Sequence, residues 1–95
     1  MQFLFAMRVQ GDLASVTGEQ REQEVAYVRE KYTADSVRHI WTRTDVAGAC
    51  LLIEASSEAA ARAVIEGLPL MQAGLLVIET FVPLQPYRGF AAAAN

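Results

Sequence analysis

The chain is short, apolar and weakly acidic. Its 95 residues leave room for one hydrophobic core, so we expect a single domain. Hydrophobic residues make up 53% of the chain and charged residues only 20%, which is much apolar side chain for so little interior. The formal charge of −3 offers no basic surface for nucleic acid or for an anionic membrane, so we expect neither as a partner.

The apolar segments predict neither a membrane span nor a secretion signal. The longest apolar runs, such as residues 74–78, are far shorter than the roughly 20 residues that cross a bilayer. The first eight residues alternate in character and lack the basic region and the cleavage site of a signal peptide. We therefore expect a cytoplasmic protein. The single cysteine, Cys50, excludes a disulfide within the chain and is expected to be inert core.

The N-terminal third predicts a strand followed by a helix. Residues 2–9 alternate with the period of two that is typical of a β-strand. Thr17 and Gln20 have the spacing of a capping box, which predicts a helix from about residue 18 to residue 31. The apolar side of this helix is a thin stripe between charged residues, and it contains Arg21, Val25, Val28 and Tyr32.

The rest of the chain predicts three more strands and a second helix. Residues 37–44 have strand composition and place His39 and Trp41 on one face, opposite Ile40. The elements expected after it are a hairpin turn at 45–48, a strand at 49–54, a helix capped by Ser56 or Ser57 that ends at Gly67, and a strand at 75–82.

The order of these elements, strand-helix-strand-strand-helix-strand, is that of the ferredoxin-like βαββαβ folds, an α+β class. We expect residues 1–84 to form the domain and residues 85–95 to form an irregular tail. Both helices would cover the same face of the sheet. Because apolar residues such as Leu51 and Leu52 point to opposite faces, the helix-free face also needs a cover. A second copy is the simplest cover, so we predict a homo-oligomer built on a dimeric α+β barrel.

The tail carries its own prediction. Pro83 and Pro86 are expected to stop further strand pairing, whereas Tyr87 and Phe90 are too apolar to be left free in water. We therefore expect the segment from Pro83 to Phe90 to leave its own domain and to lie against a neighbouring subunit.

The chain lacks the glycine-rich loops of nucleotide sites and the paired Cys or His of metal sites, so we expect no cofactor and no metal. His39 and Trp41 share a strand face and could line one cavity, although a histidine hydrogen-bonded beside a core tryptophan is the alternative. Glu24 lies beside the apolar stripe of the first helix. Partial burial would raise its pKa and suit it to carry a proton, whereas a solvated charged face is the alternative.

Three segments give the chain a resemblance to the muconolactone Δ-isomerase family, running from Met1 to about Leu84. They are Met1-Gln2-Phe3-Leu4-Phe5, Arg38-His39-Ile40-Trp41 with Arg43 nearby, and Gly67-Leu68-Pro69-Leu70. Counting back from His39 without a gap, Glu24 falls where the family has a helix glutamate thought to act as the acid and base. Arg21, one turn earlier, would hold this carboxylate ionised. The resemblance implies a dimeric barrel often assembled into a ring-like decamer, and a cofactor-free 1,3-proton shift on an unsaturated lactone.

The chain departs from this family at two places. Residues 46–50 stand where members tend to have a Tyr/Asn-rich stretch, and residues 71–73 stand where they tend to have Phe-Pro-Tyr. Both changes remove groups that could hold a small lactone with a carboxylate. A larger and more apolar substrate, as in polyketide or other natural-product tailoring, is therefore expected.

We predict a cofactor-free isomerase of a small molecule, with Glu24 and His39 as catalytic residues and Arg21, Tyr27 and Trp41 as substrate-binding residues. Tyrosines such as Tyr27 more often pack than act as acids. Because the same barrel architecture hosts several activities, a cofactor-independent cyclase or monooxygenase is an alternative. A non-catalytic small-molecule binding protein is another. An enzyme needs Glu24 within reach of a bound ligand, whereas a binding protein tolerates Glu24 fully in water.

Overall fold

The computed structural model describes residues 1–92. Four strands form one antiparallel sheet in the order β2-β3-β1-β4, which confirms the predicted ferredoxin-like α+β fold. The elements follow along the chain as β1 (Gln2–Val9), the 3-10 helix η1 (Leu13–Ser15), α1 (Gly18–Thr33), β2 (Val37–Thr42), β3 (Gly48–Glu54), α2 (Glu58–Glu66), α3 (Pro69–Gln72), β4 (Leu76–Leu84) and α4 (Arg88–Ala92).

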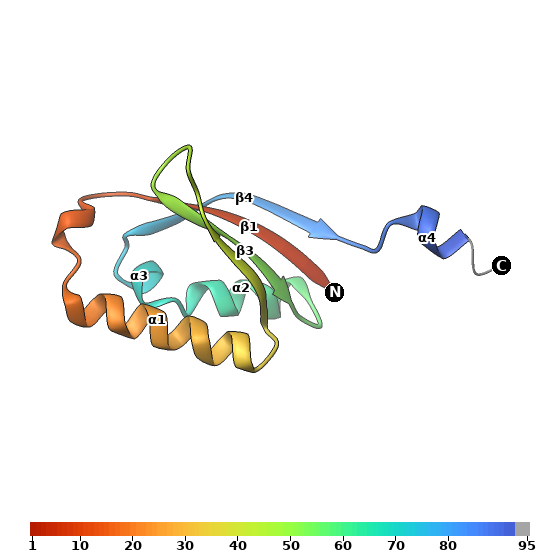
Figure 1. Cartoon of the computed structure of the whole chain (residues 1–95), viewed down its shortest axis with the longest axis horizontal. Helices are drawn as coiled ribbons and strands as arrows, with labels where there is room; N and C mark the ends of the chain where they lie inside the picture. The colour runs from red at the N-terminus through yellow and green to blue at the C-terminus, as the bar shows by residue number, and fades with distance from the viewer. Residues whose placement is uncertain (93–95) are drawn as a thin grey trace.

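The molecule has two layers, with α1, α2 and α3 on one face of the sheet and no helix of residues 1–92 covering the other (Figure 1). The alternation of β1 explains the position of the core, because Phe3, Phe5 and Met7 point toward the helices while Leu4 and Ala6 point away. The buried cluster between the two layers consists of Phe3, Phe5, Met7, Val37, Leu51, Ile53, Ala61, Ile65, Leu68 and Leu76.

Helix α1 begins where the sequence predicts. The side chain of Thr17 accepts a hydrogen bond from the backbone N–H of Gln20, and the side chain of Gln20 accepts one from the backbone N–H of Thr17, as in a capping box. Ser57 likewise caps α2, which ends at Gly67. Local hydrogen bonding therefore fixes the starts of both long helices.

The predicted apolar stripe of α1 is confirmed only at Val28, which is partly buried against the core. Val25 is 48% exposed and Tyr32 is 60% exposed, so neither faces the core. Glu24 and Tyr27 are partly buried beside Val28 instead, so the buried side of the helix is rotated from the expected one. The physical reason is that the polar atoms of Glu24 and Tyr27 find backbone partners beneath the helix, as described below, and the Tyr27 ring fills more core than Val25 would.

Strand β4 extends further than the sequence predicts. It continues through Pro83, which lies opposite Phe3, and ends at Leu84, opposite Gln2. The expectation that Pro83 stops strand pairing is therefore wrong. β4 is an edge strand, so it is hydrogen-bonded to a neighbouring strand on one side only. A proline, which has no backbone N–H, is tolerated in such a strand.

Beyond β4 the chain leaves the two layers. Figure 1 shows α4 past the end of the sheet and away from the other helices, which contributes to a longest dimension of 55 Å. The segment is partly helical, in contrast to the irregular tail that was expected. Tyr87 is 68% exposed, Phe90 is 80% exposed, and their rings meet edge to face with centroids 5.0 Å apart. Residues 93–95 of the expected tail lie outside the described residues.

None of the helices within residues 1–92 combines the length and the apolar character that a bilayer crossing requires.

Candidate functional site

A cavity of about 330 Å³ is lined by residues of the helices and of the sheet. Its walls come from seven elements and from the loop that joins β2 to β3. The lining residues are Val9, Leu13, Glu24, Thr42, Arg43, Ala47, Gly48, Ala49, Leu70 and Leu76. Most of these side chains are apolar, and Leu13, Thr42 and Ala47 are exposed, so the cavity is partly open to solvent.

Glu24 is the carboxylate in this lining. Its Oε1 accepts a hydrogen bond from the backbone N–H of Leu70 over 3.0 Å. Leu70 follows Pro69 at the start of α3, where backbone N–H groups lack partners within the helix. Burial raises the pKa of Glu24 above its ordinary value of 4.5, and the Leu70 hydrogen bond partly opposes this change. The carboxylate is thus held in place yet disposed to bind a proton.

The cation in the lining, Arg43, is already occupied by two carboxylates. Its Nε and Nη2 atoms donate to Asp45 over 3.0 and 2.6 Å, and its Nη1 donates to Glu79 of β4 over 2.8 Å. These contacts raise the pKa of Arg43 further and lower the pKa of Asp45 to about 2. They also tie the loop between β2 and β3 to the far edge of the sheet.

Gly48 is the first residue of β3 and one of the residues that line the cavity. A Cβ at this position would collide with the carbonyl oxygen of Met7 in the neighbouring strand β1. Glycine is therefore required by the close approach of the two backbones, which is one of the ordinary reasons for glycine in a strand.

His39 and Trp41 lie on the opposite face of the sheet from Glu24. His39 pairs with Leu52 and Trp41 pairs with Cys50, and residues that pair across antiparallel strands point to the same face. That face is the helix-free one, because Leu51, between these partners, is buried under the helices. The imidazole and indole rings stack there, with centroids 5.2 Å apart. The expected pocket shared by Glu24, His39 and Trp41 is therefore not found within one chain.

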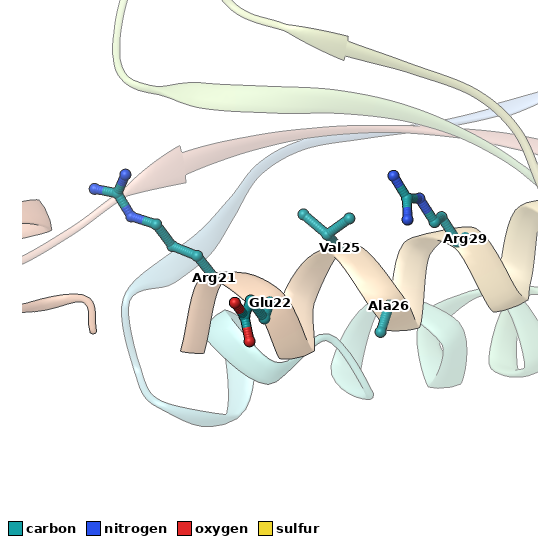
Figure 2. A pocket seen from close by; sticks show the side chains of 5 residues that line it. All are labelled: Arg21, Glu22, Val25, Ala26 and Arg29. Carbon is teal, nitrogen blue, oxygen red and sulfur yellow. The ribbon is translucent and has the colours of Figure 1, made fainter. Parts of the chain in front are cut away.

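Arg21 does not line the Glu24 cavity either. It borders a separate, shallow hollow of about 320 Å³ whose lining residues all belong to α1. Figure 2 shows Arg21, Val25 and Arg29 leaving the helix on one side and Ala26 on the other. Within residues 1–92 no salt bridge joins Arg21 to Glu24, so the expected ion pair between them is not formed. A hollow on one exposed helix offers a ligand little enclosure.

Tyr27 contacts the second helix rather than the cavity. Its hydroxyl donates a hydrogen bond to the carbonyl oxygen of Val64 over 2.7 Å. Its ring lies against Gly67, where any Cβ would collide with the hydroxyl. Tyr27 therefore joins α1 to the end of α2, and its position indicates packing more than substrate binding.

Two parts of the site escaped the sequence analysis. The Leu70 amide was missed because the Gly67-Leu68-Pro69-Leu70 segment entered only through the family resemblance, although proline is common at the first position of a helix, as at Pro69 of α3. Thr42 and Arg43 were not predicted as cavity residues, because the alternation of this strand alone does not say which of its faces the helices cover. Only the pairing of β2 with β3 places Thr42 opposite Ala49, on the helix-covered face.

Comparisons with known proteins support the fold. No protein-family model matches the chain, and no curated protein matches it. Among solved structures, it is similar to 5-chloro-2-hydroxyhydroquinone dehydrochlorinase (TftG) from Burkholderia phenoliruptrix AC1100, in complex with 2,5-dihydroxybenzoquinone. The TM-score is 0.74, the identity is 17%, and the match covers 94% of this chain and 98% of that one. It is also similar to muconolactone isomerase, with a TM-score of 0.76, 18% identity, and coverage of 92% and 91%. At such identities the likeness shows a shared fold.

Proposed function

We propose that this chain is a cofactor-free enzyme that moves a proton on a small ring compound, with Glu24 as the acid and base. The observation that carries the proposal is the half-buried Glu24 carboxylate in an apolar cavity, with a raised pKa and one oxygen held by the Leu70 amide. A non-catalytic binding protein would tolerate Glu24 in open water. The cavity around Glu24 instead favours an enzyme.

The chemistry follows from the position of the carboxylate. One oxygen of Glu24 is fixed by Leu70, which leaves the other free to take a proton from a carbon next to a carbonyl group. The electrons of that C–H bond move into the ring system, and Glu24 then returns the proton to a different carbon. A 1,3-proton shift of this kind conserves all atoms and requires one group whose pKa lies close to the working pH.

The two similar structures support a reaction on an oxygenated ring. One is an isomerase named for a lactone, and the other is a dehydrochlorinase in complex with a dihydroxybenzoquinone. Both kinds of reaction, isomerisation and loss of HCl, can begin with removal of a proton. We therefore place isomerisation first. Cyclisation or oxygenation on the same barrel architecture stays the alternative.

The direct test replaces Glu24 by glutamine. The glutamine amide would keep an oxygen for the N–H of Leu70 but would not carry a proton, so Glu24→Gln should preserve the fold and lower turnover by about 10²-fold or more. Turnover is followed by ultraviolet absorbance on a panel of unsaturated lactones and hydroxylated quinones. Glu22→Gln, the same change at an exposed position of α1, is the matched control and should keep full activity.

Near-full activity of Glu24→Gln on a compound that the native protein converts would exclude Glu24 as the proton carrier. His39 would then be the next candidate, and His39→Ala would be measured on the same compound. Loss of activity in both the Glu24 and the Glu22 variants would indicate a general effect on α1 rather than proton transfer.

A further inference from the structure

The charges around the cavity limit which ligands it can accept. Two ionisable residues line it, Glu24 and Arg43, and Arg43 donates to Asp45 and Glu79. Glu79 also lies 3.6 Å from a nitrogen of Arg8. With Glu24 ionised, these five residues carry three carboxylates (Glu24, Asp45 and Glu79) and two guanidinium groups (Arg8 and Arg43). The surroundings of the cavity are thus slightly negative.

Arg43 is poorly placed to bind a second anion. Its pairing with Asp45 uses two parallel N–H groups, which is the strong bidentate geometry of arginine and carboxylate. The Arg43 side chain is only 12% exposed, so a ligand carboxylate would have to displace Asp45 or Glu79 to reach its N–H groups. The incoming anion would lose its water and gain no free cation in return.

The apolar walls add to this effect. Val9, Leu13, Ala49, Leu70 and Leu76 face the cavity and offer an anion no hydrogen-bond donor from their side chains, which leaves the Thr42 hydroxyl as the uncharged side-chain donor of the lining. A charged group transferred among such residues without a partner carries a large desolvation cost. A negative ligand would also meet Glu24, and a like charge nearby disfavours both ions. The volume of about 330 Å³ is at the lower end of the range for ligand sites, which suits one or two fused rings.

We propose that the Glu24 cavity takes an uncharged, mainly apolar ring compound with a carbonyl or hydroxyl group, and that it rejects analogues bearing a carboxylate. This inference rests on the proposed function only in placing the substrate beside Glu24. The family resemblance alone would suggest a lactone that bears a carboxylate, whereas this inference predicts a substrate without one. The structural causes of that selectivity are the pairing of Arg43 with Asp45 and Glu79, the apolar walls and the charge of Glu24.

The test compares two probes with the same rings, 2-naphthol, which is neutral at pH 7, and 2-naphthoate, which is an anion. Titration calorimetry measures affinity, and a crystal structure of the complex locates the bound probe. We expect 2-naphthol to bind in the Glu24 cavity and 2-naphthoate to bind at least about tenfold more weakly, the factor that each 1.4 kcal/mol of binding free energy represents.

Three variants assign the cause. Glu24→Gln should narrow the difference between the probes, because it removes the repelling charge while keeping the Leu70 contact. Asp45→Asn combined with Glu79→Gln should release Arg43 and strengthen binding of 2-naphthoate selectively. Glu22→Gln, which removes one charge from the exposed side of α1, should leave the ratio of affinities unchanged.

Equal or tighter binding of 2-naphthoate in the cavity would overturn the inference. So would an unchanged ratio in both the Glu24 and the Asp45/Glu79 variants, or the absence of 2-naphthol from the cavity in the crystal. The proposed function can fail without the inference. That is the outcome if Glu24→Gln retains turnover while the native protein still prefers the neutral probe.

Discussion

The backbone N–H of Leu70 donates to Oε1 of Glu24 over 3.0 Å and so joins the start of α3 to the middle of α1. This bond gives Glu24 a structural role that can be separated from its charge. Glu24→Gln keeps the acceptor, whereas Glu24→Met has similar length and removes it. We expect Glu24→Met to lower the free energy of unfolding by about 1 kcal/mol relative to Glu24→Gln, the usual contribution of one hydrogen bond. Urea denaturation measures this difference, and equal stabilities would show that the bond contributes nothing.

The raised pKa of Glu24 makes stability depend on pH. Because the folded protein holds this proton to a higher pH than the unfolded chain does, the folded state binds more protons between the two pKa values. The contribution of Glu24 to stability is therefore largest below its ordinary pKa of 4.5 and falls as pH rises through the folded pKa. Glutamine does not titrate, so the Glu24→Gln variant should not show this fall in stability. The free energy of unfolding of the variant, relative to that of the native protein, should therefore increase from acid to neutral pH. Melting temperatures at several pH values provide the check, and a pH-independent difference would contradict the burial of the carboxylate.

Tyr27 offers a test between packing and substrate binding. Tyr27→Phe removes the hydroxyl that donates to Val64 and keeps the ring against Gly67. We expect a loss of about 1 kcal/mol in the free energy of unfolding and an unchanged KM. A raised KM with unchanged stability would support the substrate-binding role that the sequence alone predicted.

The sequence predicts the fold well because local signals agree with one another. The alternation of Phe3 and Phe5 defines the inner face of β1, and the Thr17–Gln20 capping box defines the start of α1. Neither signal depends on the rest of the molecule. The rotation of α1 does depend on it, since the partners of Glu24 and Tyr27 lie in α3 and at the end of α2.

The position of His39 relative to Glu24 illustrates what a periodic pattern leaves undetermined. In a regular strand Val37 and His39 would share a face, yet Val37 is 1% exposed under the helices while His39 lies on the other side. A register shift between these two residues separates them, because an irregularity there moves the following side chains to the opposite face. Such a shift depends on pairing with β3 and has no signature in the alternation of β2 itself.

The helix-free face of the sheet predicts self-association. Leu4, Leu52 and Val82 occupy neighbouring strands on this face, and Val82 and Trp41 are among its exposed apolar residues. Leu52→Lys should place a charge in the proposed contact with a second copy and produce monomers in sedimentation experiments. Ala63→Lys, on the exposed side of α2, is the matched control and should leave the oligomer intact. A native protein that sediments as a stable monomer at micromolar concentration would refute the contact.

The segment after β4 provides the last prediction, that it lies against a neighbouring subunit. Tyr87 and Phe90 are largely exposed and contact each other beyond the end of the sheet, and apolar rings in that position favour a partner surface. Removing the chain from Pro86 onward should lower the assembly state or the melting temperature. The double variant Tyr87→Ser with Phe90→Ser keeps the full length and should have the same effect, because it removes only the apolar rings. Arg88→Gln, which changes an exposed charge in α4, is the control for the segment. If the truncated protein and the double serine variant both keep the native oligomer and melting temperature, the segment has no role in assembly.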